Sequence, residues 1–174
     1  MAFSTRVVDD LGTLKAVSHP IRNRLLAALR ADGPATASDL GRRLGESSGS
    51  TSYHLRQLER YGFVTDDDDQ PSRRERRWRA VHDMTGLPFE LTQAPGGREL
   101  VDQIRRRQME SLQAGLAALT EPVRGFGHSD YLLRLDSDEL EALEVELEAV
   151  IARFSERRGE HVVSLHLLAL PRPS

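Results

Sequence analysis

The chain has 174 residues, 39% of them hydrophobic, with a formal net charge of −3 and no cysteine. This length suits one compact domain with an extension, or two small domains, and the hydrophobic share supports a buried core. Without cysteine there are no disulfides and no thiolate metal sites, and no apolar run approaches the roughly 18 residues of a membrane span, so the sequence predicts a cytoplasmic protein.

Two apolar stripes at helical spacing open the chain. One runs from Val7 to Val17, and the other runs from Ile21 to Leu29 and ends at Asp32-Gly33-Pro34. These stripes predict packing helices and carry no chemistry of their own.

Residues 36–62 predict two short helices joined by a turn. In the first helix, Thr36 or Ser38 can cap the N-terminus and the apolar residues are four apart, before Gly45 ends it. In the second, the buried positions recur at intervals of four and three until Gly62. They are Leu40 and Leu44 in the first helix and Thr51, Leu55 and Leu58 in the second.

The outward face of the second helix is unusual for a helix that only meets solvent. Serine and glycine are poorer helix formers than the Glu, Lys and Gln of ordinary solvent faces. Short hydroxylated side chains let a helix approach the floor of a DNA major groove, and Arg56 can reach a guanine or a phosphate. The face carries Ser48, Gly49, Ser50, Ser52, Tyr53 and Arg56. The alternative is a helical hairpin whose serines merely face water.

A β-hairpin is predicted next, with strands at 62–65 and 73–82 around a turn-prone stretch at 66–72. Helix, helix and hairpin together form a winged helix-turn-helix. Its arginines can bind phosphates or enter a minor groove, although alternating Arg and Glu can also simply solubilise an edge hairpin. They are Arg73, Arg74, Arg76 and Arg77. Asp66–Asp69 would repel phosphate, so we expect the tip of the hairpin to point away from DNA.

The segments HPIRNRLLAAL (19–29), TASDLGRRL (36–44) and STSYHLRQLERYGFV (50–64) resemble the ArsR-type winged-helix transcriptional repressors. The resemblance covers about residues 11–82. It implies a homodimer on promoter DNA that an effector releases, with base-reading residues at Ser48, Ser50, Ser52, Tyr53 and His54. The chain departs from the metal-sensing members because it has no cysteine, and no histidine lies in the helical stretch 98–120. We therefore expect no metal site and no cofactor.

Residues 83–97 are rich in glycine and proline and predict a linker. A long amphipathic helix at 98–120 follows, of the kind that builds dimer interfaces. Charge is unevenly distributed: residues 36–82 hold nine arginines and eight acids, whereas residues 129–174 hold ten acids and five arginines. The acidic C-terminal end should face away from phosphates.

The last 45 residues predict a β-α-β module, with strands at 131–135 and 162–170 around a helix that begins near Asp136 and ends by Gly159. Two strands alone leave exposed edges, so the module should pair with its copy across a dimer or pack on the helix at 98–120. An apolar cavity there would suit a small-molecule effector of unknown identity. A pure dimerisation module is the alternative.

The sequence thus predicts a mostly α, α+β protein with a winged helix-turn-helix domain (1–82), a linker (83–97) and a C-terminal dimerisation or effector region (98–174). The predicted function is sequence-specific binding of double-stranded DNA as a homodimeric transcriptional regulator, with repression as the expected output. A winged-helix module that binds protein is the alternative. No catalytic residues are expected, because no nucleophile with a base, phosphate loop or cofactor motif is present.

Overall fold

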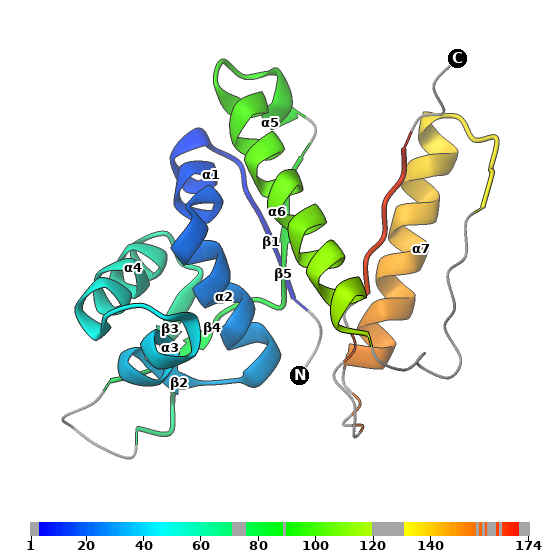
Figure 1. The fold of residues 1–174 in the computed structure, drawn as a ribbon. Coiled ribbons are helices and arrows are strands. Elements are labelled where there is room, and N and C mark those ends of the chain that lie inside the picture. Colours follow the sequence, from blue (N-terminus) through cyan, green and yellow to red (C-terminus); the bar gives the residue numbers. More distant parts are fainter. Residues whose placement is uncertain are drawn as a thin grey trace. The chain divides into compact units, whose positions relative to one another are not determined.

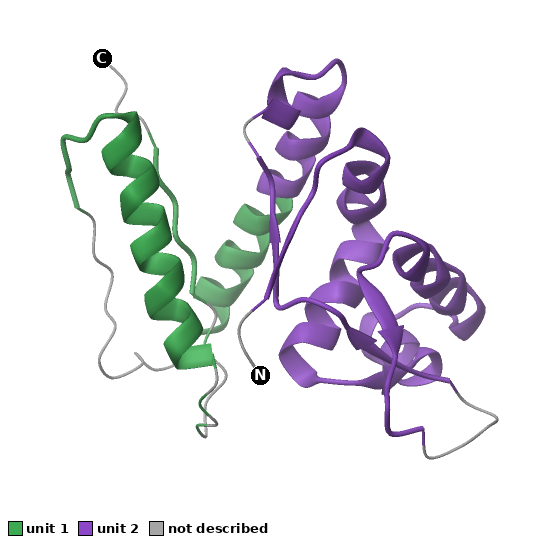
Figure 2. Ribbon diagram, turned by 180° about the vertical axis from the view of Figure 1, so that it is seen from behind, with its two compact units in different colours: residues 1–3, 107–174 green, residues 4–106 purple. Residues whose placement is uncertain are grey.

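The computed structural model describes residues 4–70, 76–88, 90–119, 131–155, 157, 159, 163 and 165–170. The chain divides into two compact units, one of residues 4–106 and one that includes residues 107–174 (Figure 2). The order of the helices and strands along the chain is shown in Figure 1.

Four helices build most of the first unit: α1 (Leu11–Ser18), α2 (Pro20–Asp32), α3 (Ala37–Leu44) and α4 (Ser48–Arg60). Their ends follow local signals. Asp10 caps α1 by accepting a hydrogen bond from the Gly12 amide at 2.7 Å, and Pro20 occupies the first turn of α2. Gly45 ends α3 in the left-handed conformation with φ of 71°. The predicted pair of helices at 36–62 is therefore confirmed.

A three-stranded antiparallel sheet completes the winged helix. Its order is β2 (Ala35–Thr36), β4 (Arg77–Ala80), β3 (Val64–Asp66). Strands β3 and β4 form the predicted hairpin, with Val64 opposite Ala80 and Asp66 opposite Trp78. The predicted fold class, a mostly helical α+β protein with a winged helix-turn-helix, is confirmed.

Helices and sheet enclose one hydrophobic core. Its largest completely buried side chains come from every helix of the domain and from the turn into the hairpin, and they are Leu14, Leu25, Leu26, Leu40, Leu55, Leu58 and Phe63. Burial of this much apolar surface supplies the main driving force for folding the unit.

The segment 83–97, for which the sequence predicts a linker, contains β5 (Met84–Gly86) and the short helix α5 (Glu90–Gln93). Strand β5 pairs in parallel with β1 (Thr5–Val7) at the start of the chain. Arg30 of α2 holds this region by donating to the His82 carbonyl and to the Thr85 hydroxyl, both at 2.9 Å. Burial lowers the pKa of Arg30 to about 10, so it stays charged at neutral pH.

The predicted long helices are present as α6 (Gly97–Ala118) and α7 (Ser137–Ser155). The flanking strands of the β-α-β prediction are wrong where the structure describes them, because residues 131–136 and 165–170 form no ladder with any described residue; residues 162 and 164 lie outside the described part. Their alternating apolar side chains suit a sheet surface, but a strand also needs a neighbouring backbone to bond with, and neither segment has one among the described residues. Among the described residues, no helix combines the length and the apolar character needed to cross a membrane.

Candidate nucleic-acid interface

Helix α4 is anchored through one face and capped at its start. The Ser47 side chain accepts from the Ser50 amide at 3.2 Å, and the Thr51 hydroxyl donates to the Ser47 carbonyl at 2.9 Å. Thr51, Leu55 and Leu58 have no exposed surface. Because these three side chains lie on one side of the helix, its opposite side is free to meet a ligand.

An open hollow of about 390 Å³ lies where the beginnings of α3 and α4 meet strand β4. It is lined by Thr36, Ala37, Ser38, Ser48, Gly49, Ser52, Arg56, Arg76 and Trp78. Ser48, Ser52 and Arg56 follow at four-residue intervals and so form one line along α4. Hydroxyl groups both donate and accept hydrogen bonds, while helix N-termini and guanidinium groups favour anions. The hollow therefore suits phosphate oxygens and the polar edges of bases.

The outermost side of α4 carries an aromatic ring and two arginines. Tyr53 is 58% exposed, and Arg56 and Arg60 are also exposed. No hydrogen bond or ion pair joins either arginine to another described residue. Arg42 on α3, by contrast, is paired with Asp39. The unneutralised positive charge of the helix pair thus lies on α4.

The side of α4 nearest α2 is more enclosed. His54 is half-buried, with its ring centroid 4.7 Å from that of His19 and 5.2 Å from that of Tyr53, which it meets edge to face. Burial, and secondarily the Arg22 guanidinium, lowers the pKa of His54, so the ring is neutral at pH 7. Ser50, on the same side, is also half-buried. His54 therefore acts mainly as a packing partner of Tyr53 and is less accessible to a ligand than Tyr53 is.

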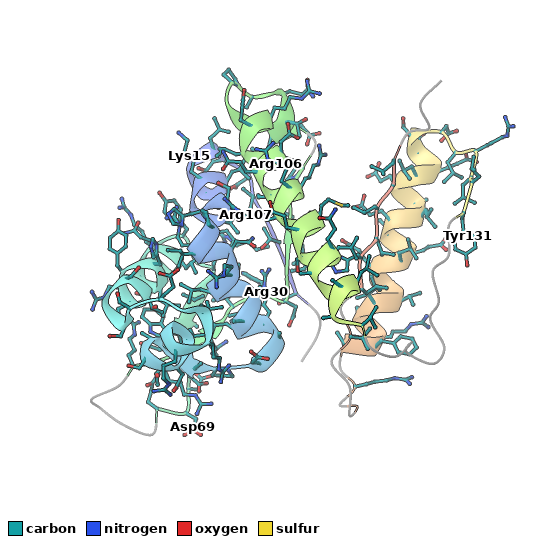
Figure 3. The ribbon with its side chains drawn as sticks, viewed as in Figure 1. Lys15, Arg30, Asp69, Arg106, Arg107 and Tyr131 are labelled. Carbon is teal, nitrogen blue, oxygen red and sulfur yellow. The ribbon has the colours of Figure 1, made fainter. Side chains whose placement is uncertain are left out.

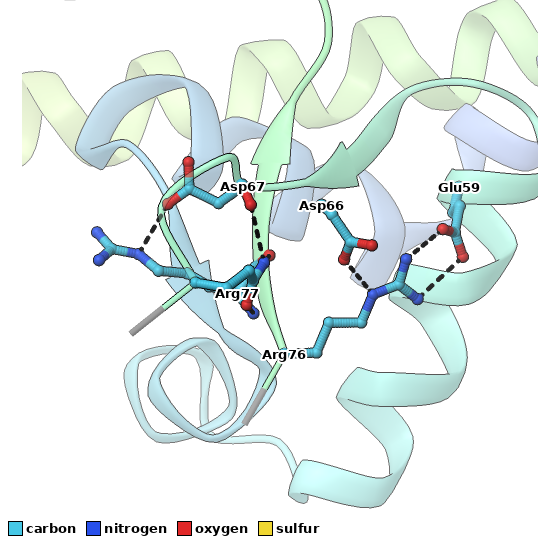
Figure 4. Close-up of polar contacts among 6 residues, drawn as sticks. Glu59, Asp66, Asp67, Arg76 and Arg77 are labelled. Atoms are coloured by element: carbon cyan, nitrogen blue, oxygen red, sulfur yellow. Dashed lines mark hydrogen bonds and ion pairs between the residues drawn. The ribbon is translucent and has the colours of Figure 1, made fainter. Parts of the chain in front are cut away.

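Arg76 joins the wing to α4 (Figure 4). Its guanidinium donates to Glu59 on α4 and to Asp66 on β3, and it lies 3.8 Å from the centroid of the Trp78 ring. The two carboxylates raise the pKa of Arg76, and the hydrogen bond from Arg76 holds the pKa of Asp66 below its usual value. The predicted phosphate ligand is therefore engaged within the protein.

The acidic turn of the hairpin is mostly paired with arginines of the opposite strand. The Nε atom of Arg77 lies 3.3 Å from a carboxylate oxygen of Asp67. A terminal guanidinium nitrogen of Arg79 lies 3.5 Å from a carboxylate oxygen of Asp68. Asp69 is exposed at the outer end of the hairpin (Figure 3). The sequence predicts only that these acids repel DNA, whereas the structure shows that they also neutralise the wing.

Eight of the ten residues predicted to bind DNA thus fall into four groups. Ser48, Ser52, Arg56 and Arg76 line the hollow; Tyr53 projects from α4; Ser50 and His54 are half-buried beside α2; and Arg77 lies on the wing next to Asp67. Arg73 and Arg74 lie outside the described residues. Arg76 and Arg77 would have to exchange carboxylates for phosphates in order to contact DNA.

Sequence reasoning missed two contributors to this surface. The first is Ser38. Thr36 caps α3 by accepting a hydrogen bond from the Asp39 amide at 3.1 Å, so Ser38 does not serve as the cap and instead lines the hollow. Trp78 forms the wall below Arg76, and a tryptophan flanked by arginines is a recognisable signal for cation–π stacking. Among the described residues, no three His, Asp or Glu side chains are placed to bind a metal ion.

Comparison with known proteins places a helix-turn-helix domain at residues 17–67. The solved structures that are similar include HlyU from Vibrio cholerae, with 26% identity, 40% of this chain and 70% of that chain covered, and a TM-score of 0.35. The transcriptional repressor BigR from Xylella fastidiosa has 24% identity, coverage of 41% and 68%, and a TM-score of 0.35. The Zα domain of PKZ from Carassius auratus, solved with Z-DNA, has 17% identity, coverage of 37% and 98%, and a TM-score of 0.33.

No curated protein matched the chain. The family match contains α2, α3, α4 and strand β3, and so includes the exposed side of α4 and the residues of the hollow other than Arg76 and Trp78. The chain therefore contains a winged helix-turn-helix domain.

Proposed function

We propose that this chain is a sequence-specific DNA-binding transcriptional regulator that acts as a homodimeric repressor on promoter DNA, as its resemblance to ArsR-type repressors implies. Residues 1–82 bind DNA, and residues 98–174 serve dimerisation. The observation that carries the proposal is the exposed side of α4, where hydroxyls, Tyr53 and Arg56, which has no ion-pair partner among the described residues, adjoin a hollow at two helix N-termini.

In this proposal α4 enters the major groove. Ser48, Ser52 and Tyr53 contact base edges, and Arg56 binds a guanine or a phosphate. The start of α3 approaches the DNA backbone, where the Ser38 hydroxyl and the α3 amides favour a phosphate oxygen. Short side chains at Ser48 and Gly49 let the helix backbone come close to the bases.

The test is binding of the full chain to the DNA upstream of its own coding sequence, measured by gel shift over a series of salt concentrations. We expect a discrete complex that survives an excess of unrelated competitor DNA and weakens as salt rises. Footprinting of that complex would then identify the operator. Failure to prefer any sequence, even in a selection from random DNA at low salt, would contradict the proposal.

Substitutions on α4 separate DNA recognition from folding. Tyr53→Ala and Ser52→Ala should each weaken specific binding, because both side chains face outward, while the thermal unfolding midpoint changes little. Removing a side chain that contacts a base should reduce the difference in binding free energy between the operator and unrelated DNA by about 1–3 kcal/mol. If both variants bind the operator as tightly as the wild type, Ser52 and Tyr53 do not read it, and the proposed contacts of α4 with the bases are contradicted.

A further inference from the structure

Helix α7 has no buried residue, and the same is true of every described residue from 107 onward. Its large apolar side chains instead stand open to solvent. Leu140 is 45% exposed, Leu147 37%, Val150 41% and Phe154 56%. The described residues of this unit therefore form no core in a single copy, and a protein does not ordinarily leave such a surface uncovered.

Five apolar residues of α7, four of them exposed and Leu143 half-buried, have the spacing of a coiled coil. Leu140, Leu143, Leu147, Val150 and Phe154 are separated by three, four, three and four residues. This alternation averages 3.5 residues and corresponds to positions a and d of a heptad. We call these five residues the α7 seam. A heptad seam is shaped for another helix of the same kind, since each side chain fits between four residues of the facing helix.

We propose that the α7 seam is covered by α7 of a second copy of this chain, with the two helices antiparallel. The inference rests on the homodimer of the proposed function and specifies its interface. It uses only the surface of the C-terminal unit.

The charges beside the α7 seam determine whether the two helices run parallel or antiparallel. Position g of the heptads is occupied by Glu139, Glu146 and Arg153, and position e by Glu144 and Ile151. In an antiparallel pair, position g faces position g of the partner and position e faces position e. Glu139 then meets Arg153 of the other copy twice by symmetry, whereas Glu144 and Glu146 each meet their own copy once. In a parallel pair, position g faces position e, and Glu139 meets Glu144 twice without any attractive pair. Only the antiparallel arrangement brings opposite charges together.

The test is the dimer dissociation constant of the full chain, measured by analytical ultracentrifugation. Leu147→Gln should weaken the dimer at least about a hundredfold, because the substitution affects both copies at the centre of the seam. The matched control is Val145→Gln, which removes an apolar side chain that is 61% exposed on the far side of the same helix. It should leave the dissociation constant unchanged.

Charge reversal tests the direction. Arg153→Glu should weaken the dimer about tenfold, and the double variant Glu139→Arg with Arg153→Glu should restore it, because the attractive pairs are re-formed with the signs exchanged. Restoration would exclude a general loss of folding as the cause.

Other outcomes overturn the interface without touching DNA recognition. If Leu147→Gln remains as dimeric as the wild type, the seam is covered within the chain or by another protein. If the double variant stays weak, the helices are not antiparallel. A wild type that is monomeric throughout would contradict both the interface and the proposed homodimer, whereas the operator gel shift would still decide whether the chain reads DNA.

Discussion

Arg56 is exposed on α4, lines the hollow and has no ion-pair partner among the described residues. Arg76 reaches the same hollow but binds two carboxylates and stacks on Trp78. Two arginines at one surface therefore have different costs of contacting a phosphate. Arg56 only sheds water, whereas Arg76 must also leave Glu59 and Asp66.

Arg56→Ala should weaken operator binding by about 1–3 kcal/mol if the guanidinium reads a guanine. If it binds a phosphate instead, the salt dependence should fall by about one unit of slope. Fluorescence anisotropy over a salt series measures both. Arg98→Ala, which removes another exposed arginine at the start of α6, is the matched control and should change neither quantity. Equal effects of the two variants would show that only overall charge matters.

Asp66→Asn should reduce stability in a pH-dependent way. The pKa of Asp66 is lowered in the folded protein by Arg76, so its stabilising effect is complete above the unfolded value near 3.8 and is lost as pH falls through the folded value. Because both partners are partly exposed, the effect should be at most about 1 kcal/mol. In urea unfolding, the difference in the free energy of unfolding between Asp66→Asn and the wild type should be roughly constant between pH 5 and 8 and should shrink below about pH 4. A difference that grows in acid would contradict the pairing.

At the scale of elements, the turn between α3 and α4 depends on the absence of a side chain at Gly41. A Cβ atom there would lie 2.8 Å from the Glu46 carbonyl oxygen and 3.2 Å from the Thr51 hydroxyl. The Glu46 amide also donates to the Gly41 carbonyl at 2.9 Å. The two helices of the motif thus meet through backbone.

Gly41→Ala should therefore destabilise the domain by about 1–3 kcal/mol, although alanine ordinarily favours a helix. Gly49→Ala is the control, because nothing lies within 4 Å of the added methyl group at the start of α4. It should be neutral or slightly stabilising in chemical denaturation, while it can still hinder DNA at the proposed interface. If Gly41→Ala stabilises the protein as Gly49→Ala does, the close approach of the helices is not tight.

Sequence reasoning succeeds for α3 and α4 because their signals are local. A cap, a three-to-four spacing and Gly45 all lie within the elements they define. It fails for β1, whose partner strand β5 lies far along the chain. It fails also for the described parts of the segments 131–135 and 162–170, where alternation predicts strands that find no neighbour in the described chain. Long-range pairing has no local signature, and the same applies to Arg76, whose partners come from two other elements.

At the scale of the whole molecule, a net charge of −3 is unexpected for a DNA-binding protein. The structure reduces this conflict by placing the unpaired positive charge on α4, whereas the sequence predicts it also on the wing. In the described part of the wing the arginines are paired, because Asp66, Asp67 and Asp68 neutralise Arg76, Arg77 and Arg79. The positive charge that can attract DNA is concentrated on α4, so the protein should neutralise only a small number of phosphates when it binds.

The double variant Asp67→Asn with Asp68→Asn should release Arg79 and remove the carboxylate beside Arg77, whose guanidinium still donates to the Pro34 carbonyl at 3.1 and 3.2 Å. Non-specific DNA affinity should then rise and its salt dependence should steepen, because an arginine that has lost its carboxylate partner can displace a counterion from a phosphate. Binding to unrelated DNA over a salt series measures both effects. Glu90→Gln with Glu99→Gln, which removes two exposed acids outside the wing, controls for the change in total charge. Equal behaviour of the two double variants would contradict a specific role for the turn.

Under the proposed function, the paired charges in the described part of the wing also bear on how the protein finds its operator. A regulator with many free arginines lingers on any duplex and diffuses along it, so most copies are held at irrelevant sites in a genome. A wing that is already neutral shortens each such residence, and the molecule returns to solution between encounters. Recognition then depends on how well α4 matches the bases, and the search proceeds by repeated landing more than by long travel along one stretch of DNA.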